Sequence, residues 1–471
     1  MIHSPSRRFI LAVIALLAIL ADSAGIPHVL ADRGARPTTD QNAGLTVTPS
    51  DGTVSLILHL APTSVPPVDV AAFRGQGRLA FVWSGQLYLL NGDAGILRRL
   101  AAVGLIGNLA WSPDGHWLAY IHVTNGDLGS GQLWVVRADG SDAHQVMGLP
   151  APVQTFSWSP VANMLAIGLQ YSPHGPSGLW LATPLGRPRE LAANGAGAQW
   201  SPDGGMLAYS ATLQFTNPLG RSDALYTVPA AGGAPARRFV AKEDGIELLG
   251  WWPNGKGVLF WRDPLHSASI AADGLMLYTL PLGGAPTPHP LTTTLTYPDW
   301  IARSPSGRRL LLVSGGGREA WHDKSLSTCD VVTAACQAVS TQHGTVALDP
   351  AWSPRDNRIA FVQARDLGNA GGFGGTQPLQ AWVQTHTLWV ASATGAGAHE
   401  LTAAGASVYQ PQWSHDGRHL LYIRDDAVWL VDANGGAPVK IVGPFPSAPP
   451  LFGYYGHVDW TTYIPLAWHQ P

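Results

Sequence analysis

Leu109-Ala-Trp-Ser-Pro-Asp-Gly-His-Trp-Leu-Ala-Tyr-Ile121 is the stretch that decides the fold of this chain. An apolar segment runs into a tryptophan, a Pro-Asp-Gly turn follows, and a second short β-rich segment comes after it. The recurrence of this pattern predicts a repeat protein, in which similar modules are added to one body. The variants are Phe156-Ser-Trp-Ser-Pro, Gln199-Trp-Ser-Pro-Asp-Gly, Gly250-Trp-Trp-Pro-Asn-Gly, Arg303-Ser-Pro-Ser-Gly, Ala351-Trp-Ser-Pro and Gln412-Trp-Ser-His-Asp-Gly.

The aromatic position of each motif gives the period of the repeat. Spacings between these positions run from 38 to 61 residues, as expected of a four-stranded propeller blade. Each unit continues with a second hairpin whose Asp-Gly, Gly-Gly or Asn-Gly turn supplies the positive-φ residues that tight turns need. The positions are Phe73, Trp111, Trp158, Trp200, Trp251, Arg303, Trp352 and Trp413.

The predicted fold is all-β: a β-propeller of four-stranded antiparallel blades, with eight blades expected and seven as the alternative. A four-stranded sheet cannot bury both faces alone, so each blade must pack on its neighbours around a shared axis. Most of the 19 tryptophans are therefore assigned to blade packing instead of a sugar-stacking site. The chain shows no long helical periodicity, so helix should be scarce.

The motifs resemble the TolB-type, WD40-like propeller repeat, whose mark is Trp-Ser-Pro-Asp-Gly followed by a Leu-Ala-Phe/Tyr strand. The resemblance covers about residues 68–460. Three units depart from the pattern, at Phe73-Arg-Gly-Gln-Gly, at Val161-Ala162 and at Arg303, and these departures put blade boundaries in doubt but not the fold. The TolB family itself is typically six-bladed, whereas eight units are similar to the propellers of the dipeptidyl-peptidase-like family.

The two ends of the chain bear on how the ring closes. Val458-Asp-Trp460 is similar to a further inner strand, and Thr53–His59 predicts a strand outside any unit. An open ring would leave two exposed sheet edges. We therefore expect these end segments to complete a blade or to cover the seam.

The N-terminus carries an export signal. Arg7 and Arg8 precede an apolar run from Phe9 to Ala21 that is too short to span a bilayer comfortably and typical of a secretory signal. The run also resembles a twin-arginine signal, and an uncleaved N-terminal anchor is the alternative. We expect residues 1–31 to be a signal peptide, 32–44 a disordered linker and 45–471 a single β-propeller domain. The mature protein would be secreted, periplasmic or at the cell surface, monomeric, and without a membrane span.

The net charge and the cysteine content bear on nucleic-acid binding, on disulfide formation and on metal binding. A net charge of −3 gives no basic footprint for nucleic acid. Cys329 and Cys336 flank a strand end and a turn, which predicts a cross-strand disulfide in an exported chain, with two buried free thiols as the alternative. Two cysteines without clustered histidines make a poor zinc site, so neither a metal nor a cofactor is expected.

The candidate binding residues lie in the connections between blade strands, called A to D from the axis outward. The A–B and C–D turns share one side of the disc, the turn face, while the B–C and D–A connections share the other, the long-loop face. Long loops in compact domains are usually functional or disordered. The cationic and aromatic candidates there, suited to an acidic sugar, a peptide carboxylate or a partner loop, are Arg262, His266, Trp321, His322, Arg365, Phe373 and Trp382. The alternative is that these arginines only anchor the loops.

Enzyme signatures are mostly missing. There is no Gly-x-Ser-x-Gly motif, and too few residues follow Trp460 for a hydrolase domain. The leading hypothesis is a non-catalytic module that binds a protein or glycan through the long-loop face. One alternative is a polysaccharide lyase, because oligogalacturonate lyases resemble this arrangement, with His266, His322 and His386 brought together around a metal. Another is a structural scaffold whose channel is plugged, with Gly371–Gly375 as the plug.

Overall fold

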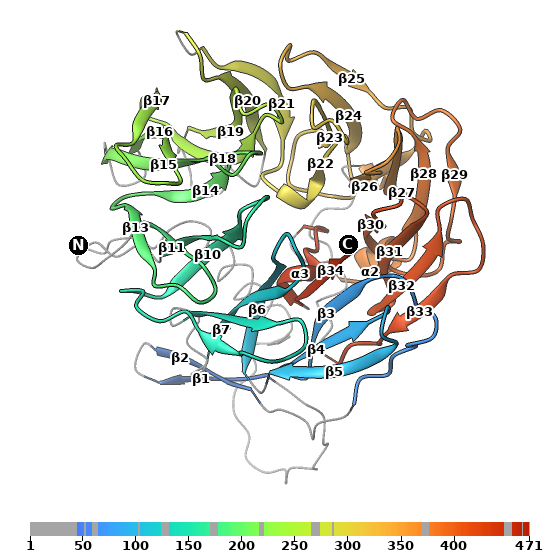
Figure 1. The fold of residues 1–471 in the computed structure, drawn as a ribbon. Helices are drawn as coiled ribbons and strands as arrows, with labels where there is room; N and C mark the ends of the chain where they lie inside the picture. The colour runs from blue at the N-terminus through green and yellow to red at the C-terminus, as the bar shows by residue number, and fades with distance from the viewer. Residues whose placement is uncertain are drawn as a thin grey trace, which may run out of the picture.

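The computed structural model describes residues 45–50, 53–58, 65–101, 104–123, 131–169, 178–215, 221–264, 274–284, 287–368, 376–446, 455–463 and 465–470. Eight four-stranded antiparallel sheets form a closed ring (Figure 1). The predicted all-β propeller is therefore confirmed, with eight blades and not seven. Helix is scarce in the described residues: η3 (Pro298–Trp300), α2 (Thr376–Val383) and α3 (Trp460–Tyr463).

The strands of blades 2 to 8 follow in chain order from the axis outward. Blade 2 contains β6 (Leu105–Trp111), β7 (Trp117–Val123), β8 (Gln132–Arg137) and β9 (His144–Gln145). Blade 3 contains β10 (Val153–Trp158), β11 (Leu165–Leu169), β12 (Leu179–Ala182) and β13 (Arg189–Ala192), and blade 4 contains β14 (Ala196–Trp200), β15 (Met206–Phe215), β16 (Arg221–Pro229) and β17 (Ala236–Ala241). Blade 5 contains β18 (Gly245–Trp251), β19 (Gly257–Asp263), β20 (Leu275–Pro281) and β21 (His289–Thr294).

The remaining blades keep the same order. Blade 6 contains β22 (Ile301–Arg303), β23 (Arg309–Ser314), β24 (Ser325–Asp330) and β25 (Cys336–Ala338). Blade 7 contains β26 (Thr345–Trp352), β27 (Arg358–Arg365), β28 (Thr387–Ser392) and β29 (His399–Glu400), and blade 8 contains β30 (Val408–Trp413), β31 (His419–Arg424), β32 (Ala427–Asp432) and β33 (Val439–Val442).

Blade 1 is built from both ends of the ring. It contains β3 (Arg78–Trp83), β4 (Gln86–Asn91) and β5 (Ile96–Ala101), while its innermost strand is β34 (Leu466–His469) from the C-terminal end. In register, Trp468 lies opposite Leu79 just as Trp111 lies opposite Leu118 in blade 2. The motif position of blade 1 is therefore Trp468, and the assignment of Phe73 to it was wrong. Phe73 is buried in the turn before β3.

The expected closing segments also differ from those observed. Val458-Asp-Trp460 does not form the further inner strand; Trp460 begins α3, and the inner strand of blade 1 begins at Leu466. β2 (Thr53–Leu58) pairs with β1 (Leu45–Ser50) and not with a blade. The segment at Val68 instead bridges to Val442 on the outer strand of blade 8, so both ends of the ring meet at one seam. The domain limits at residues 31 and 44 stay predictions, because residues 1–44 lie outside the described part.

In five blades the motif tryptophan joins the blade to the one before it. Its indole N–H donates to the carbonyl of the residue that precedes the motif position in the previous blade, so the predicted role in blade packing is confirmed. These bonds run from Trp111 to Ala467 (3.0 Å), Trp158 to Ala110 (3.0 Å), Trp200 to Ser157 (3.2 Å), Trp251 to Gln199 (2.9 Å) and Trp413 to Ala351 (3.2 Å).

Blades 1, 6 and 7 differ. In blade 1 the Trp468 indole donates to the carbonyl of Gln76 at 2.6 Å, and in blade 6 Arg303 occupies the motif position. Its guanidinium donates from Nη1 to the carbonyl of Trp251 at 2.9 Å and so replaces the indole contact. In the next blade the buried indole nitrogen of Trp352 has no hydrogen-bond partner among the described residues.

The Ser-Pro-Asp-Gly sequence forms a turn closed by its own side chains. The Ser112 hydroxyl donates to Asp114 at 2.6 Å and accepts from the backbone N–H of Trp117 at 2.9 Å, while Gly115 adopts the positive φ (66°) that the turn needs. The same serine contacts recur at Ser201 and Ser414. The repeated sequence is therefore a repeated turn structure.

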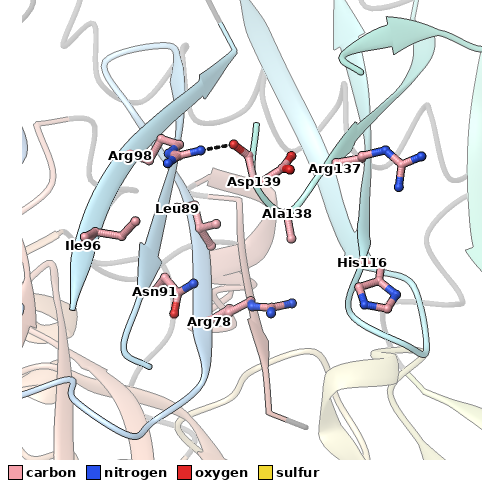
Figure 2. Close-up of a pocket in the computed structure, with 9 residues that line it drawn as sticks. All are labelled: Arg78, Leu89, Asn91, Ile96, Arg98, His116, Arg137, Ala138 and Asp139. Carbon is pink, nitrogen blue, oxygen red and sulfur yellow. Dashed lines mark hydrogen bonds between the residues drawn. The ribbon is translucent and has the colours of Figure 1, made fainter. Parts of the chain in front are cut away.

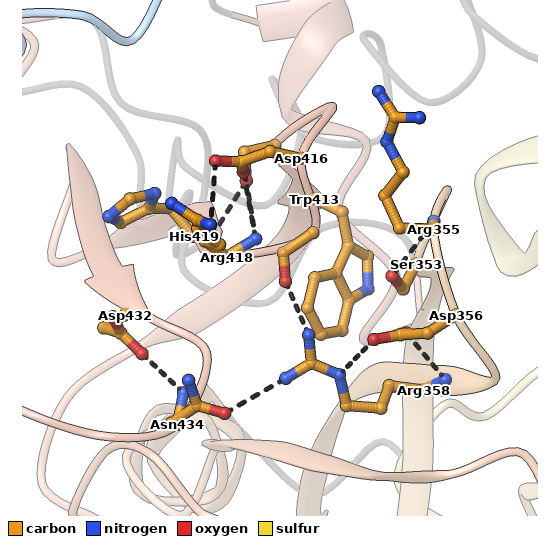
Figure 3. A network of polar contacts seen from close by, with 12 residues as sticks. Ser353, Arg355, Asp356, Arg358, Trp413, Asp416, Arg418, His419, Asp432 and Asn434 are labelled. Atoms are coloured by element: carbon orange, nitrogen blue, oxygen red, sulfur yellow. Dashed lines mark hydrogen bonds and ion pairs between the residues drawn. The ribbon is translucent and has the colours of Figure 1, made fainter.

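Polar side chains tie blades 7 and 8 together on the turn face (Figure 3). Arg358 forms an ion pair with Asp356 at 2.8 Å and donates to the Gly417 carbonyl at 2.6 Å and to the Asn434 side chain at 3.2 Å. Its guanidinium also lies 5.1 Å from the ring centroid of Trp413. One side chain thus contacts two turns of the neighbouring blade and its motif tryptophan.

The predicted disulfide is present between Cys329 and Cys336, which face each other across β24 and β25. It joins the two outer strands of blade 6. Among the helices that the structure describes, none is sufficiently long and apolar to cross a membrane.

Candidate functional site

The C-terminal segment 455–463 begins beside blade 6 and ends in α3, which lies beside β6 of blade 2 before the chain becomes β34 (Figure 1). The carbonyl of Tyr455 accepts from the backbone N–H of Ala320 in blade 6 at 2.8 Å. Val458 and Trp460 are 3% and 2% exposed. The chain therefore fills part of its own axial region with apolar side chains, while the expected plug Gly371–Gly375 lies outside the described residues.

A partly buried polar cluster holds this segment to the blades. His457 places Nε2 2.8 Å from Oδ2 of Asp299, and its ring stacks on Tyr297 with centroids 3.7 Å apart. The Gln410 amide donates to the same Asp299 oxygen at 3.2 Å. Asp349 accepts from the Trp300 indole and from the backbone N–H of Gln410, each at 2.9 Å. We call Asp299, Asp349, Gln410 and His457 the axial cluster.

Burial and mutual charge shift the pKa values in the axial cluster. Burial opposes the ionisation of Asp299, but the charge and hydrogen bond of His457 outweigh it and lower the Asp299 pKa. Burial likewise opposes protonation of His457, yet Asp299 raises its pKa. Burial, followed by the charge of Asp299, raises the pKa of Asp349 to about 6. Such shifts occur at functional sites and in structural ion pairs alike, and here the polar atoms bond to one another.

The inner strands carry bulges at a repeated position, three residues before the motif position. Asn108, Asp349 and Gln410 adopt φ values of 53°, 48° and 45° there, and the pairing of each strand with its neighbour shifts register beside them. Non-glycine residues in this conformation are uncommon and collect at functional sites. Two of the three belong to the axial cluster. An alignment of the repeats that compared the position three residues before the motif position could have found Asp349 and Gln410.

Part of the axial region stays hollow. A cavity of about 300 Å³ lies between the inner strands of blades 2 and 3 and the C-terminal segment, with Asn108, Phe156 and Thr461 in its wall. The amide, the aromatic ring and the hydroxyl give it both polar and apolar lining.

Four of the sequence-predicted site residues lie together at the long-loop end of blades 6 and 7. Trp321 and Trp382 are 4% and 1% exposed and pack edge to face, with ring centroids 6.3 Å apart. The Trp382 indole donates to the carbonyl of Arg365 at 2.8 Å. His322 places Nδ1 2.8 Å from Asp366. The two tryptophans thus support the loops from inside, and a direct part in binding stays a prediction for all four.

The other predicted residues are placed separately. Arg262 forms an ion pair with Asp244 and lies 5.6 Å from the ring centroid of Tyr278, which is the anchoring arrangement considered as the alternative. His266 and Phe373 lie outside the described residues. A binding role for these three also stays a prediction.

The metal set of the lyase alternative does not assemble from the described histidines. His322 pairs with Asp366, whereas His386 is buried against Trp382 and donates from Nδ1 to the Val408 carbonyl at 3.0 Å. Burial lowers the pKa of His386 to about 4. Within the described ranges, no three His, Cys, Asp or Glu side chains are grouped so that they could hold a metal ion.

The blades, their turns and the indole contacts define the chain as an eight-bladed β-propeller whose repeats have the TolB-type pattern. No family model matches the sequence, and no curated protein matches it either. The comparison with solved structures therefore concerns the fold alone.

Three solved structures illustrate the likeness. TolB from Acinetobacter baumannii is 15% identical with a TM-score of 0.37, covering 58% of this chain and 66% of that one. The putative TolB from Agrobacterium tumefaciens is 16% identical with a TM-score of 0.33, covering 72% and 94%. Acylaminoacyl peptidase from Pyrococcus horikoshii is 11% identical with a TM-score of 0.44, covering 72% of this chain and 52% of that one. Sequence identities and TM-scores this low carry no argument about function.

Proposed function

We propose that this protein is an exported, non-catalytic module that binds a protein or glycan partner through its long-loop face. The observation that carries the proposal is the B–C hairpin of blade 4. β15 is ten residues long and β16 nine, so the pair extends the long-loop face. Near its tip Leu213 and Phe215 are 43% and 71% exposed. Exposed apolar and aromatic side chains on a projecting element favour partner contact.

Polar contacts hold this hairpin where it extends beyond the blade. Asp223, 2% exposed, pairs with Arg221 at 2.9 Å and accepts from the Thr212 hydroxyl at 2.8 Å. Its second oxygen also accepts from the backbone N–H of Ile246 in blade 5 at 2.9 Å. A contact surface ordered before binding loses less conformational entropy on association. The hairpin is thus suited to present Phe215 to a partner.

Three further observations support the proposal. The polar atoms of the axial cluster bond to one another, which favours a structural use of that cluster over a reactive one. The predicted signal peptide and the Cys329–Cys336 disulfide both agree with export to an oxidising compartment. The net charge of −3 favours partners other than nucleic acid. A monomer remains the expected state.

The test uses matched substitutions on the two faces. Phe215→Ser changes a side chain that is 71% exposed on the long-loop face, and Leu185→Ser changes one that is equally exposed in a C–D turn on the turn face. Purified protein would be used to capture partners from the culture medium and cell envelope and to probe a glycan array. A partner retained by the wild type and by Leu185→Ser, but lost by Phe215→Ser, is expected. Equal retention by Phe215→Ser would contradict the proposal.

A structural scaffold with a plugged channel is the second candidate, favoured by the buried Val458 and Trp460 of the C-terminal segment. This alternative predicts that the same capture experiment yields no partner and no glycan with the wild type.

A further inference from the structure

A pocket of about 260 Å³ lies between blades 1 and 2 on the turn face, opposite to the long-loop face (Figure 2). Strands β3, β4 and β5 supply Arg78, Leu89 and Arg98, and the two turns of blade 2 supply the other wall. In Figure 2, Arg98 and Arg78 lie above and below Leu89; Arg98 faces the turn that carries Asp139, and Arg78 points toward the turn that carries His116. The pocket thus sits beside the blade that the C-terminal strand completes.

Two arginines bring positive charge to this pocket without a carboxylate partner among the described residues. Arg78 donates from Nη1 to the Gly115 carbonyl at 2.6 Å, and Arg98 donates to the Asp139 carbonyl. A carbonyl oxygen accepts a hydrogen bond but carries no net charge. Each guanidinium also keeps further N–H donors, since arginine has five. These two groups are therefore available to an anion.

The remaining charged groups of the wall have partners of their own. Arg137 pairs with Asp142 and lies 4.4 Å from the Trp117 ring centroid. His116 lies 3.0 Å from Asp114. The Asp139 carboxylate accepts from the hydroxyl and backbone N–H of Ser141, at 2.6 and 2.9 Å. Asp139 is the one negative charge in the wall, against the two arginines without acidic partners.

Beside the polar Asn91, the wall between the two arginines contains apolar side chains. Leu89 is 2% exposed at its base, and Ile96 is 41% exposed at its edge. An inorganic ion would leave this surface uncovered, whereas a ligand with a carbon body would bury it. Arginine is the side chain best suited to bind carboxylate or phosphate oxygens in pairs.

We infer that the pocket binds a small organic oxyanion, a carboxylate or phosphate ester on a carbon body, between Arg78 and Arg98 and against Leu89 and Ile96. The pocket would be a ligand site on the turn face, independent of the partner surface proposed on the long-loop face. Neither site shares a residue with the other.

Isothermal titration calorimetry on the full chain tests the inference with glucuronate and glucose 6-phosphate, which carry the two oxyanions on one carbon body. Glucose serves as the neutral control, and inorganic phosphate as the anion without the body. At least one sugar anion should bind more tightly than glucose and inorganic phosphate do. Added salt should weaken the binding of that anion. Which of the two binds identifies the oxyanion.

Variants locate the binding. Arg98→Gln, at an exposed position, should weaken the affinity for the sugar anion at least about tenfold, as loss of a charge-assisted hydrogen bond does. Ile96→Asp should also weaken this affinity, because it adds negative charge to the pocket. Arg418→Gln, at a turn-face arginine that is 77% exposed outside the pocket, should leave it unchanged. The inference is overturned if neither sugar anion binds, if glucose or inorganic phosphate binds as tightly, or if Arg98→Gln and Ile96→Asp bind like the wild type. Phe215→Ser should bind the anion normally, which separates this result from the partner test.

Discussion

The chain contains two motif tryptophans that are equally buried but differ in one hydrogen bond. Trp251 is 6% exposed and donates to the Gln199 carbonyl at 2.9 Å, whereas Trp352 is 7% exposed and its indole nitrogen has no partner among the described residues. Replacing each with phenylalanine removes a similar volume from a similar place. The difference between the two variants therefore reports mainly on the indole N–H.

The magnitude follows from the two environments. Trp251→Phe loses a hydrogen bond with a net value of about 1 kcal/mol and leaves a carbonyl unpaired, while Trp352→Phe removes an unpaired buried donor, whose burial costs about 1–3 kcal/mol. Arg309 lies 5.2 Å from the Trp352 ring centroid. Trp352→Phe weakens this cation–π contact, which destabilises that variant and reduces the difference between the two variants by about 0.5 kcal/mol. We expect Trp251→Phe to lower the free energy of unfolding by about 2 kcal/mol more than Trp352→Phe.

Equilibrium urea unfolding followed by far-ultraviolet circular dichroism provides the assay, with midpoints compared where the denaturant slopes agree. Trp158→Phe, which loses the bond to the Ala110 carbonyl, is a second control and should behave like Trp251→Phe. The reasoning is refuted if Trp352→Phe, with a native spectrum, is destabilised as much as Trp251→Phe or more.

Three other predictions concern ties within and between blades. His457 has a raised pKa, so its stabilising effect is complete below its ordinary value of 6.5 and disappears as the pH rises through the raised value; stability curves of His457→Gln should be flatter than those of the wild type above pH 6.5. Arg358→Gln should lower the free energy of unfolding by about 1–2 kcal/mol through the loss of its bonds to blade 8, while Arg418→Gln changes it by less than about 0.5 kcal/mol; a urea midpoint equal for the two would contradict this. Joint replacement of Cys329 and Cys336 by alanine should cost about 2 kcal/mol, because a short loop is no longer closed in the unfolded chain, and dithiothreitol should shift the wild-type midpoint but not that of the variant.

The blade pattern was predictable from sequence because its contacts are local. Ser112, Asp114 and Gly115 form the turn among themselves, and the indole contacts repeat with the same spacing as the motif. Closure was harder to predict because β34 has no Pro-Asp-Gly turn after it. Its signal was nevertheless present: Leu466-Ala-Trp468 repeats Leu109-Ala-Trp111.

The axial cluster could not be predicted from local sequence patterns. Gln410 lies 111 residues and His457 158 residues from the Asp299 that both contact, and only the closed ring brings them together. Trp321 and Trp382 illustrate a different limit. Their loops were located correctly by topology, but composition alone could not show that the two rings pack under the loop surface instead of on it.

The origin of β34 has a consequence for biosynthesis. Strands β3, β4 and β5 emerge from the ribosome before the strands of every other blade, yet their sheet lacks its inner member until residues 466–469 have been made. During that interval the edge of β3 is open to pairing with other chains. A nascent or prematurely terminated polypeptide is therefore exposed to aggregation, and β34 covers the β3 edge only after all the other blade strands have been made.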